Sequence, residues 1–124
     1  MSDNIIATRS LDFAVKIVEL YSEKKEYVLS KQLLRSGTSV GANTAEAQRG
    51  QSKPDFISKM NIALKEANET DFRLRLMNRT GYISQIKFIE MKSDIDSIIN
   101  ILIASINKAK SNLTKEIQLP SPPQ

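Results

Sequence analysis

The sequence predicts an all-α protein, an antiparallel four-helix bundle with up-down-up-down topology. Apolar residues recur at alternating intervals of three and four through most of the chain, which is the spacing of one helix face. Glycine and proline, which interrupt helices, number only four each among 124 residues. The interruptions leave four long segments joined by short connections, and short connections make consecutive helices antiparallel neighbours.

The first helix is expected from about residue 6 to residue 23. Leu11, Ala14, Val18 and Tyr21 recur at intervals of three, four and three, so we predict that they form its inner face. The charged run at positions 22–26 predicts the turn that follows.

The second helix is expected to begin near Ser30, as an N-cap, and to reach about Gly50. Gly37 and Gly41 lie one turn apart, and each costs roughly 1 kcal/mol of helix propensity relative to alanine. They indicate either that another backbone approaches closely or that the helix is kinked or broken at Gly37. The predicted inner face is built of small side chains: Leu33, Gly37, Val40, Thr44 and Ala47.

The third helix shows the strongest periodicity in the chain. Pro54 is a favoured first helical residue, Asp55 suits the helix dipole, and Gly81 is expected just past the C-terminus. The predicted inner face repeats at intervals of four and three without a miss: Phe56, Met60, Ala63, Ala67, Thr70, Leu74 and Met77.

The fourth helix is expected after a short turn, with Ser84 as its cap. Its predicted inner face holds Phe88, Ile95, Ile99, Leu102, Ile106 and Ala109, and it is broadened by Met91, Ile98 and Ile103. This wide apolar surface is either ordinary bundle core or partly a subunit interface. We expect the bundle to cover residues 1–118 and residues 119–124, which hold three prolines, to be a disordered tail.

Composition excludes several classes of site. The chain has no cysteine and no histidine, so it lacks thiolate ligands, histidine bases and the Glu-x-x-His sites of di-iron bundles. Glu66 and Glu69 are adjacent on a helix, but we favour ion pairs with Arg35, Lys65 or Arg73, or plain exposure. We expect no metal, no cofactor and no enzymatic activity.

Two further expectations concern the cellular location of the protein and the positions of its aromatic residues. The polar start and the absence of an apolar run of about 20 residues predict a soluble, cytoplasmic protein without a membrane partner. The tyrosines and phenylalanines mostly fall at predicted core positions, so no aromatic platform for stacking bases is expected.

The second helix also carries cations at a regular spacing. Lys31 and Arg49 are 18 residues apart, as are Arg35 and Lys53, and 18 residues make about five whole turns. In one continuous helix these four residues form a line, here called the basic ridge, which suits a phosphate backbone. The alternative is a solvated helix face with Arg35 held in an intramolecular ion pair.

The sequence resembles a known protein family in two runs, Leu33–Ala47 and Asp55–Thr70, and in the Gly81-Tyr-Ile that follows them. The family it resembles is that of the 23S ribosomal RNA intervening-sequence proteins, also called S23-type proteins. The resemblance implies a four-helix bundle that assembles into a homo-pentamer. The family includes the accessory protein of diversity-generating retroelements, which binds nucleic acid through basic residues. The resemblance implies roles that are structural or interfacial as much as functional for six residues: Arg35, Gly37, Asn43, Glu46, Glu66 and Glu69.

These observations leave two main hypotheses. The first is a pentameric protein that binds RNA or DNA through the basic ridge repeated around a ring, where several weak patches gain avidity. The second is a structural or protein-interaction module with no nucleic-acid role, indicated by the apolar fourth helix and the small-residue face of the second.

Overall fold

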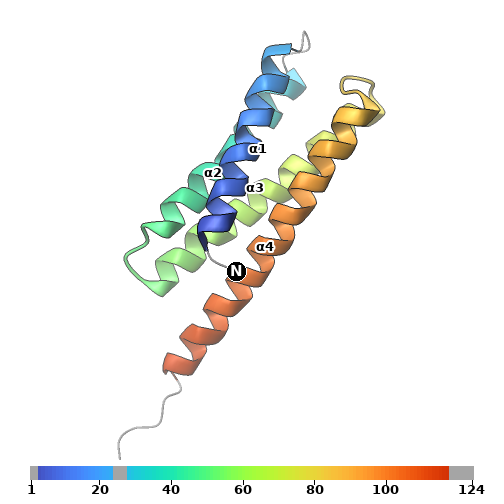
Figure 1. Cartoon of the computed structure of the whole chain (residues 1–124). Coiled ribbons are helices and arrows are strands. Elements are labelled where there is room, and N and C mark those ends of the chain that lie inside the picture. The colour runs from blue at the N-terminus through green and yellow to red at the C-terminus, as the bar shows by residue number, and fades with distance from the viewer. Residues whose placement is uncertain (1–2, 24–27, 118–124) are drawn as a thin grey trace, which may run out of the picture.

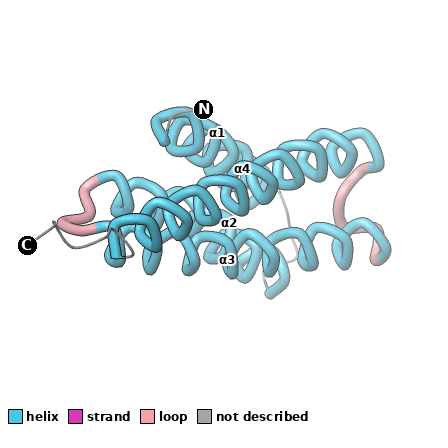
Figure 2. Tube along the Cα trace, turned by 90° about the horizontal axis from the view of Figure 1, so that it is seen from below, coloured by secondary structure: helices cyan, strands magenta, loops and turns pink. Residues whose placement is uncertain are grey.

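A computed structural model describes residues 3–23 and 28–117, and all regular structure in these ranges is helical (Figure 2). The helices are α1 (Asp3–Glu23), α2 (Val28–Gln48), α3 (Lys53–Arg79) and α4 (Gln85–Ile117). No described helix combines the length and the apolar character that crossing a bilayer requires. The predicted tail at residues 119–124 lies outside the described residues.

The four helices form the predicted antiparallel bundle. Each packs against the next in the chain, and α1 lies against α4, so the order around the bundle is α1, α2, α3, α4 (Figure 1). Glu46 pairs with Lys59 at one end of the α2–α3 contact, whereas Arg35 pairs with Glu69 further along. Residue numbers therefore rise along α2 as they fall along α3, which is the antiparallel arrangement.

The predicted inner faces of α2 and α3 are confirmed. Every predicted core position of α2 is buried, and so is every one of α3 except Phe56, which is partly buried against the core. On α4, Ile103 is 42 % exposed, so it does not belong to the core, whereas Ile101 is buried. The remaining core side chains of α4 are Met91, Ile95, Ile98, Leu102 and Ile106.

The predicted inner face of α1 was wrong. Leu11 is 64 % exposed and Val18 is 50 % exposed, because α1 is rotated so that a different stripe faces the core. The stripe that is buried also has helical spacing: Ile6, Ser10, Phe13, Ile17 and Leu20. Helix α1 therefore carries two apolar stripes, one inside the bundle and one on its surface.

Close packing explains the glycines of α2. A methyl group added at Gly37 would lie 2.8 Å from Cγ1 of Ile17, and one added at Gly41 would lie 3.4 Å from the carbonyl oxygen of Ser10. The second contact is with the backbone of α1 itself. Helix α2 continues through both positions, so the alternative of a break at Gly37 is not realised.

Capping residues mark the starts of α3 and α4 and the end of α3. The hydroxyl of Ser52 accepts a hydrogen bond from the Asp55 N–H at 3.2 Å, and Ser84 accepts one from the Lys87 N–H at the same distance. Gly81 follows α3 with a φ of +80°, as expected for a glycine past a helix end. Ser30 was wrongly predicted as a cap, because α2 begins at Val28 and buries it.

Polar side chains line the edge of the contact between α1 and α4. Lys16 lies 2.6 Å from Asp94 and 3.3 Å from Glu90, and Arg9 donates a hydrogen bond to Ser97. The hydrogen bond with Asp94 raises the pKa of Lys16 above its ordinary value. A shallow cleft of about 170 Å³ runs beside these residues. The two helices are thus joined by charge pairs flanking a narrow apolar contact.

Helix α4 extends beyond the start of α1 (Figure 1). Past this point a shallow groove of about 310 Å³ follows the side of α4 that α1 covers elsewhere. We call it the α4 groove. Among the described residues its lining side chains are Asn100, Ile101, Ala104, Ser105 and Lys108. This part of α4 offers apolar surface that α1 does not cover.

We expect the two α2 glycines to respond differently to alanine. Gly37→Ala should lower the free energy of unfolding by about 1–2 kcal/mol, because crowding against Ile17 outweighs the gain in helix propensity. Gly41→Ala should be neutral or stabilising by up to about 1 kcal/mol, because the new methyl group fits at ordinary contact distance. Urea unfolding followed by circular dichroism at one protein concentration measures both. Equal losses in the two variants would contradict this account of the contact.

Candidate functional site

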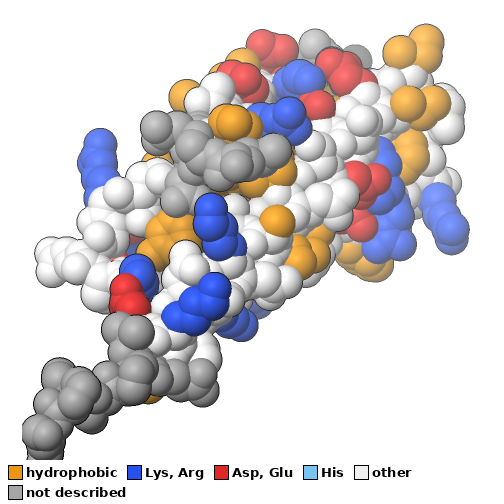
Figure 3. All heavy atoms as spheres, turned by 60° about the horizontal axis from the view of Figure 1, so that its bottom comes forward, with side chains coloured by type: hydrophobic (Ala, Val, Ile, Leu, Met, Phe, Trp, Pro, Cys, Tyr) orange, Lys and Arg blue, Asp and Glu red, His pale blue; other side chains and the backbone are white. Residues whose placement is uncertain are grey.

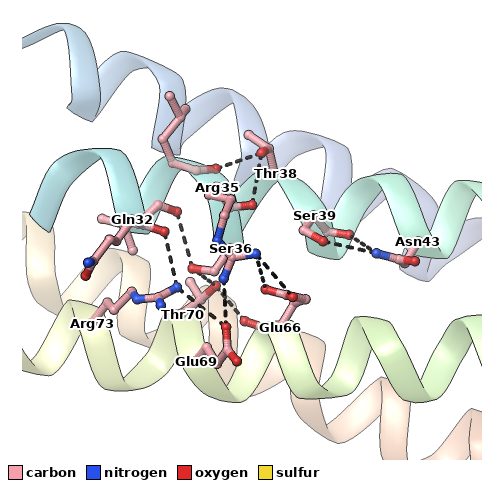
Figure 4. Close-up of polar contacts among 12 residues, drawn as sticks. Gln32, Arg35, Ser36, Thr38, Ser39, Asn43, Glu66, Glu69, Thr70 and Arg73 are labelled. Atoms are coloured by element: carbon pink, nitrogen blue, oxygen red, sulfur yellow. Dashed lines mark hydrogen bonds and ion pairs between the residues drawn. The ribbon is translucent and has the colours of Figure 1, made fainter. Parts of the chain in front are cut away.

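A polar network joins α2 to α3 at the positions where the sequence suggested functional residues (Figure 4). Arg35 lies 3.2 Å from Oε2 of Glu66 and 2.9 Å from Oε2 of Glu69. The hydrogen bond with Glu66 is the main reason that the pKa of Arg35 is raised above its ordinary value. The guanidinium group clamps two carboxylates of the neighbouring helix.

The network continues on both sides of Arg35. Arg73 donates a hydrogen bond to the carbonyl oxygen of Gln32 at 3.2 Å, and it lies 3.6 Å from Glu69 (Figure 4). Deeper in the bundle the hydroxyl oxygens of Ser36 and Thr70 lie 3.0 Å apart, and both residues are fully buried. The two small hydroxyl side chains let α2 and α3 approach closely, while the two arginines join the helices at the surface.

The basic ridge is not continuous. Helix α2 ends at Gln48, so Arg49 lies just past it and Lys53 is the first residue of α3. Lys53 therefore does not point in the direction around α2 that we predicted for all four cations of the basic ridge. Its ammonium group pairs with Glu116 of α4. With Arg35 also paired, two of the four predicted cations are held in ion pairs.

Lys31 and Arg49 are the other two members of the basic ridge. Both are exposed, and neither lies within ion-pair distance of a described carboxylate. Lys31 lies near the start of α2 and Arg49 just past its end. The ridge thus reduces to two separated free cations and two internal ion pairs.

Basic side chains also gather around the end of the molecule where α4 finishes (Figure 3). Lys108, Lys110 and Lys115 of α4 are exposed there, and Lys53 and Glu116 connect α3 to the same region. These α4 lysines did not stand out in the sequence, because their spacing forms no line with the cations of α2.

The remaining predicted structural residues have internal partners. The side-chain amide of Asn43 donates to the carbonyl oxygen of Ser39 at 2.9 Å, one turn earlier on α2. Glu46 lies 3.1 Å from Lys59 of α3. Gly37 and Gly41 face α1, as described above. These contacts hold α2 to itself and to its two neighbours.

The carboxylates do not form a metal centre in the described part of the chain. No group of three or more acidic residues there is arranged to hold a metal ion. The two candidate carboxylates, Glu66 and Glu69, are both directed at arginines. This is the ion-pair interpretation that the sequence favoured, and it gives them a structural role.

The expectation that the aromatic residues mostly lie in the core is only partly confirmed, since Phe13 is buried and Phe56 and Phe88 pack against the core. Phe72 is 57 % exposed and Tyr82 is 42 % exposed, whereas only Phe13 among the described aromatic residues is fully buried. Phe72 falls between Thr70 and Leu74, which are both inner positions of α3, so it has to point away from the core. The periodicity of α3 therefore already indicated that Phe72 is exposed.

Comparison with known proteins now defines the family. The family model described as "23S rRNA-intervening sequence protein" matches residues 2–104. The chain belongs to this family. The match ends before the last part of α4, so the exposed lysines of that end lie outside it.

A solved member of the family supports the fold. The crystal structure of a protein with unknown function from the S23 ribosomal protein family of Bacteroides thetaiotaomicron VPI-5482 is similar to this chain, with 51 % sequence identity and a TM-score of 0.83. The similarity covers 86 % of this chain and 99 % of the other. A search of curated proteins found no match.

We expect Arg35 to stabilise the bundle. Arg35→Met should lower the free energy of unfolding by about 1–2 kcal/mol, because Glu66, whose side chain is 12 % exposed, loses its main cation. Lys31→Met, on the same helix but without a described ion partner, should change it by less than about 0.5 kcal/mol. Adding Glu66→Gln to Arg35→Met should recover part of the loss. Urea unfolding measures all three, and equal effects of Arg35→Met and Lys31→Met would refute the clamp.

Proposed function

We propose that this protein is a non-enzymatic assembly module whose copies associate through the surface of α1 and α2. The observation that carries the proposal is the second apolar stripe of α1. Leu11, Val15 and Val18 are 64 %, 48 % and 50 % exposed, and they lie within about 60° of one another around the helix. A contiguous exposed apolar surface of this kind is typical of protein interfaces.

Charge is excluded from the exposed apolar stripe of α1. Between residues 5 and 22 the charged side chains of α1 lie within a separate sector of about 80°, on the side that faces α4. Those side chains are Arg9, Asp12, Lys16 and Glu19. Depletion of charge at the centre of a surface is the composition that distinguishes interface cores from ordinary exposed surface.

Helix α2 extends the same surface. Its Gly37 and Gly41 side contacts α1, and the adjacent outward sector carries small side chains in the stretch between Lys31 and Arg49. We call the combined surface the α1–α2 face. It consists of Thr8, Leu11, Val15 and Val18 from α1 and Thr38, Ala42 and Ala45 from α2. Small side chains on α2 beside larger ones on α1 give a surface on which another helix can lie.

The α4 groove supplies a second surface of matching character. Ala104 is exposed and Ile101 lies at its base, and the groove continues the side of α4 that binds α1 within one subunit. Contact between two different surfaces is heterologous, and it builds a ring when the rotation between copies closes. We therefore propose a ring in which the α1–α2 face of each copy packs on the α4 groove of the next. The family resemblance favours five copies.

Self-association is tested by charging the two surfaces separately. Sedimentation equilibrium of the unchanged protein should give several times the chain mass of 13.9 kDa. Leu11→Lys combined with Val18→Lys, and Ala104→Glu alone, should each reduce the mass to that of one chain, because a buried unpaired charge opposes association.

Ile86→Lys is the matched control. Ile86 is 84 % exposed and apolar, but it lies about 27 Å along α4 from Ala104. This variant should keep the mass of the unchanged protein. A monomeric unchanged protein, or a mass insensitive to the Leu11 and Val18 changes, would sink the proposal.

Nucleic-acid binding through α2 is the second candidate. Exposed Lys31 and Arg49 favour it, since each is free to contact a phosphate and a ring would repeat both around its circumference. Their contribution is limited by the internal pairing of Arg35 and Lys53.

We expect Lys31→Gln combined with Arg49→Gln to weaken duplex DNA binding and to lower the slope of log affinity against log salt by about 1.8, for two phosphate contacts. Arg35→Gln should leave the slope unchanged, because its charge is already paired. Fluorescence anisotropy over a salt series measures both slopes. If the double variant keeps the full slope, these residues do not contact phosphate.

A further inference from the structure

The outward face of α3 carries an aromatic side chain between two free cations. Phe72 is 57 % exposed. Lys65 and Arg79 lie seven residues before and after it, so all three fall within about 40° around the helix and span about 21 Å. Lys65 and Arg79 are exposed and lie within ion-pair distance of no described carboxylate.

A groove runs along one side of the Phe72 ring. Its volume is about 380 Å³, within the range of small-ligand sites. Its lining consists of Gln32 from α2 and Asn68, Glu69, Phe72, Arg73 and Leu76 from α3. We call it the Phe72 groove. It places two side-chain amides, from Gln32 and Asn68, in the same groove as an aromatic face.

The carboxylates of this region are neutralised by protein cations. Glu69 lies 2.9 Å from Arg35 and 3.6 Å from Arg73. Asp71 lies 2.8 Å from Lys92 and 3.3 Å from Arg75. Negative charge is therefore held inside the surface, while the two free cations of this face remain available to an anionic ligand.

Arg75 adds a second contact to the ring. Its guanidinium carbon lies 5.9 Å from the centroid of Phe72, within the range of cation–π attraction. Asp71 holds the same guanidinium group from the side. The ring is thus supported in an outward position by a side chain of its own helix and is not folded onto the core.

We propose that the Phe72 groove is a stacking site for one base of a single-stranded nucleic acid. The Phe72 ring stacks on the base, the amides of Gln32 and Asn68 reach its edge, and Lys65 and Arg79 contact phosphates on either side. A span of about 21 Å corresponds to roughly four nucleotides, near the lower limit of known single-strand sites. A duplex fits poorly, because its base faces are already stacked.

The inference goes beyond both proposed functions. It uses residues of one subunit, so it needs no self-association, and it uses neither Lys31 nor Arg49. A phosphate-only surface would bind duplex and single strands alike, whereas an exposed ring gains energy only from an unpaired base. The combination of ring, amides and flanking cations favours a single strand over an acidic protein partner.

The test is fluorescence anisotropy of the full chain with short labelled uridine, thymidine and mixed-sequence duplex oligonucleotides at about 50 mM and about 200 mM salt. Both single strands should bind with similar affinity and about tenfold more tightly than the duplex, since the site reads a base face and phosphates. Phe72→Leu, which keeps apolar bulk but loses the ring, should weaken single-strand binding by about 5- to 100-fold.

Charge and aromatic controls separate stacking from general attraction. Lys65→Gln and Arg79→Gln should each lower the single-strand salt slope by about 0.7. Lys110→Gln, an exposed cation of α4, should not change it. Tyr82→Leu, an exposed aromatic residue outside the groove, should bind like the unchanged protein.

Four results would overturn the proposal. The first two are that Phe72→Leu binds single strands as tightly as the unchanged protein does, and that the protein binds duplex as tightly as single strands. The third is that no single strand binds at low salt. The fourth is a strong preference for RNA, which would require the protein to recognise the ribose. Sedimentation of Phe72→Leu is the remaining check. A changed mass would identify Phe72 as a subunit contact and overturn the site, whereas an unchanged mass with weakened binding supports it.

Discussion

Ile17 of α1 packs into the space that the missing side chain of Gly37 leaves on α2, and the rotation of α1 depends on this contact. The distance of 2.8 Å from Ile17 to the place of a Gly37 methyl group shows how little room there is. One turn further along α2, the backbone of Ser10 lies against Gly41. With α1 fixed in this orientation, Phe13 enters the core and Leu11 faces outward. The exposed stripe is thus a consequence of the glycines on the neighbouring helix.

This dependence explains why the sequence predicted α2 and α3 well and α1 poorly. Each of the first two has one apolar stripe, so its periodicity determines which face is buried. Helix α1 has two stripes of similar spacing, and periodicity alone does not rank them. The choice is made by shape, because only the stripe with Ile17 fits the Gly37 surface. Shape matching between helices is a tertiary property that one segment of sequence does not contain.

Some features of the candidate site could likewise be predicted from the sequence and others could not. Pairing of Arg35 with Glu66 and Glu69 was foreseen as the alternative to phosphate binding, because opposite charges on adjacent helices attract wherever the fold brings them together. The basic ridge depended on one helix continuing through Lys53, and it fails because α2 ends at Gln48. Phe72 could have been found from the register of α3, since it lies between two inner positions. Its groove could not, because Gln32 reaches it from another helix.

The charge distribution shows why a count of cations is a poor guide to an anion-binding surface. Along the α2–α3 contact, Arg35 and Arg73 are paired with two carboxylates, those of Glu66 and Glu69. On the other side of α3, Arg75 and Lys92 both form ion pairs with Asp71. These cations contribute mainly to holding helices together. Most of the net charge of +4 therefore lies on residues outside this network, and the exposed cations there include Lys31, Lys65, Arg79 and the lysines at the end of α4.

The positions of the two proposed surfaces make them compatible. Helix α1 contacts α2 and α4, while α3 lies diagonally across the bundle from it. The outward face of α1 and the outward face of α3 therefore point in different directions from one core. A subunit can bury Leu11 and Val18 against a second copy without covering Phe72 through that same face. If both surfaces act together, a ring would carry one base-stacking site per subunit. Binding of a longer single strand would then strengthen with the number of subunits it can reach, because each further contact is intramolecular.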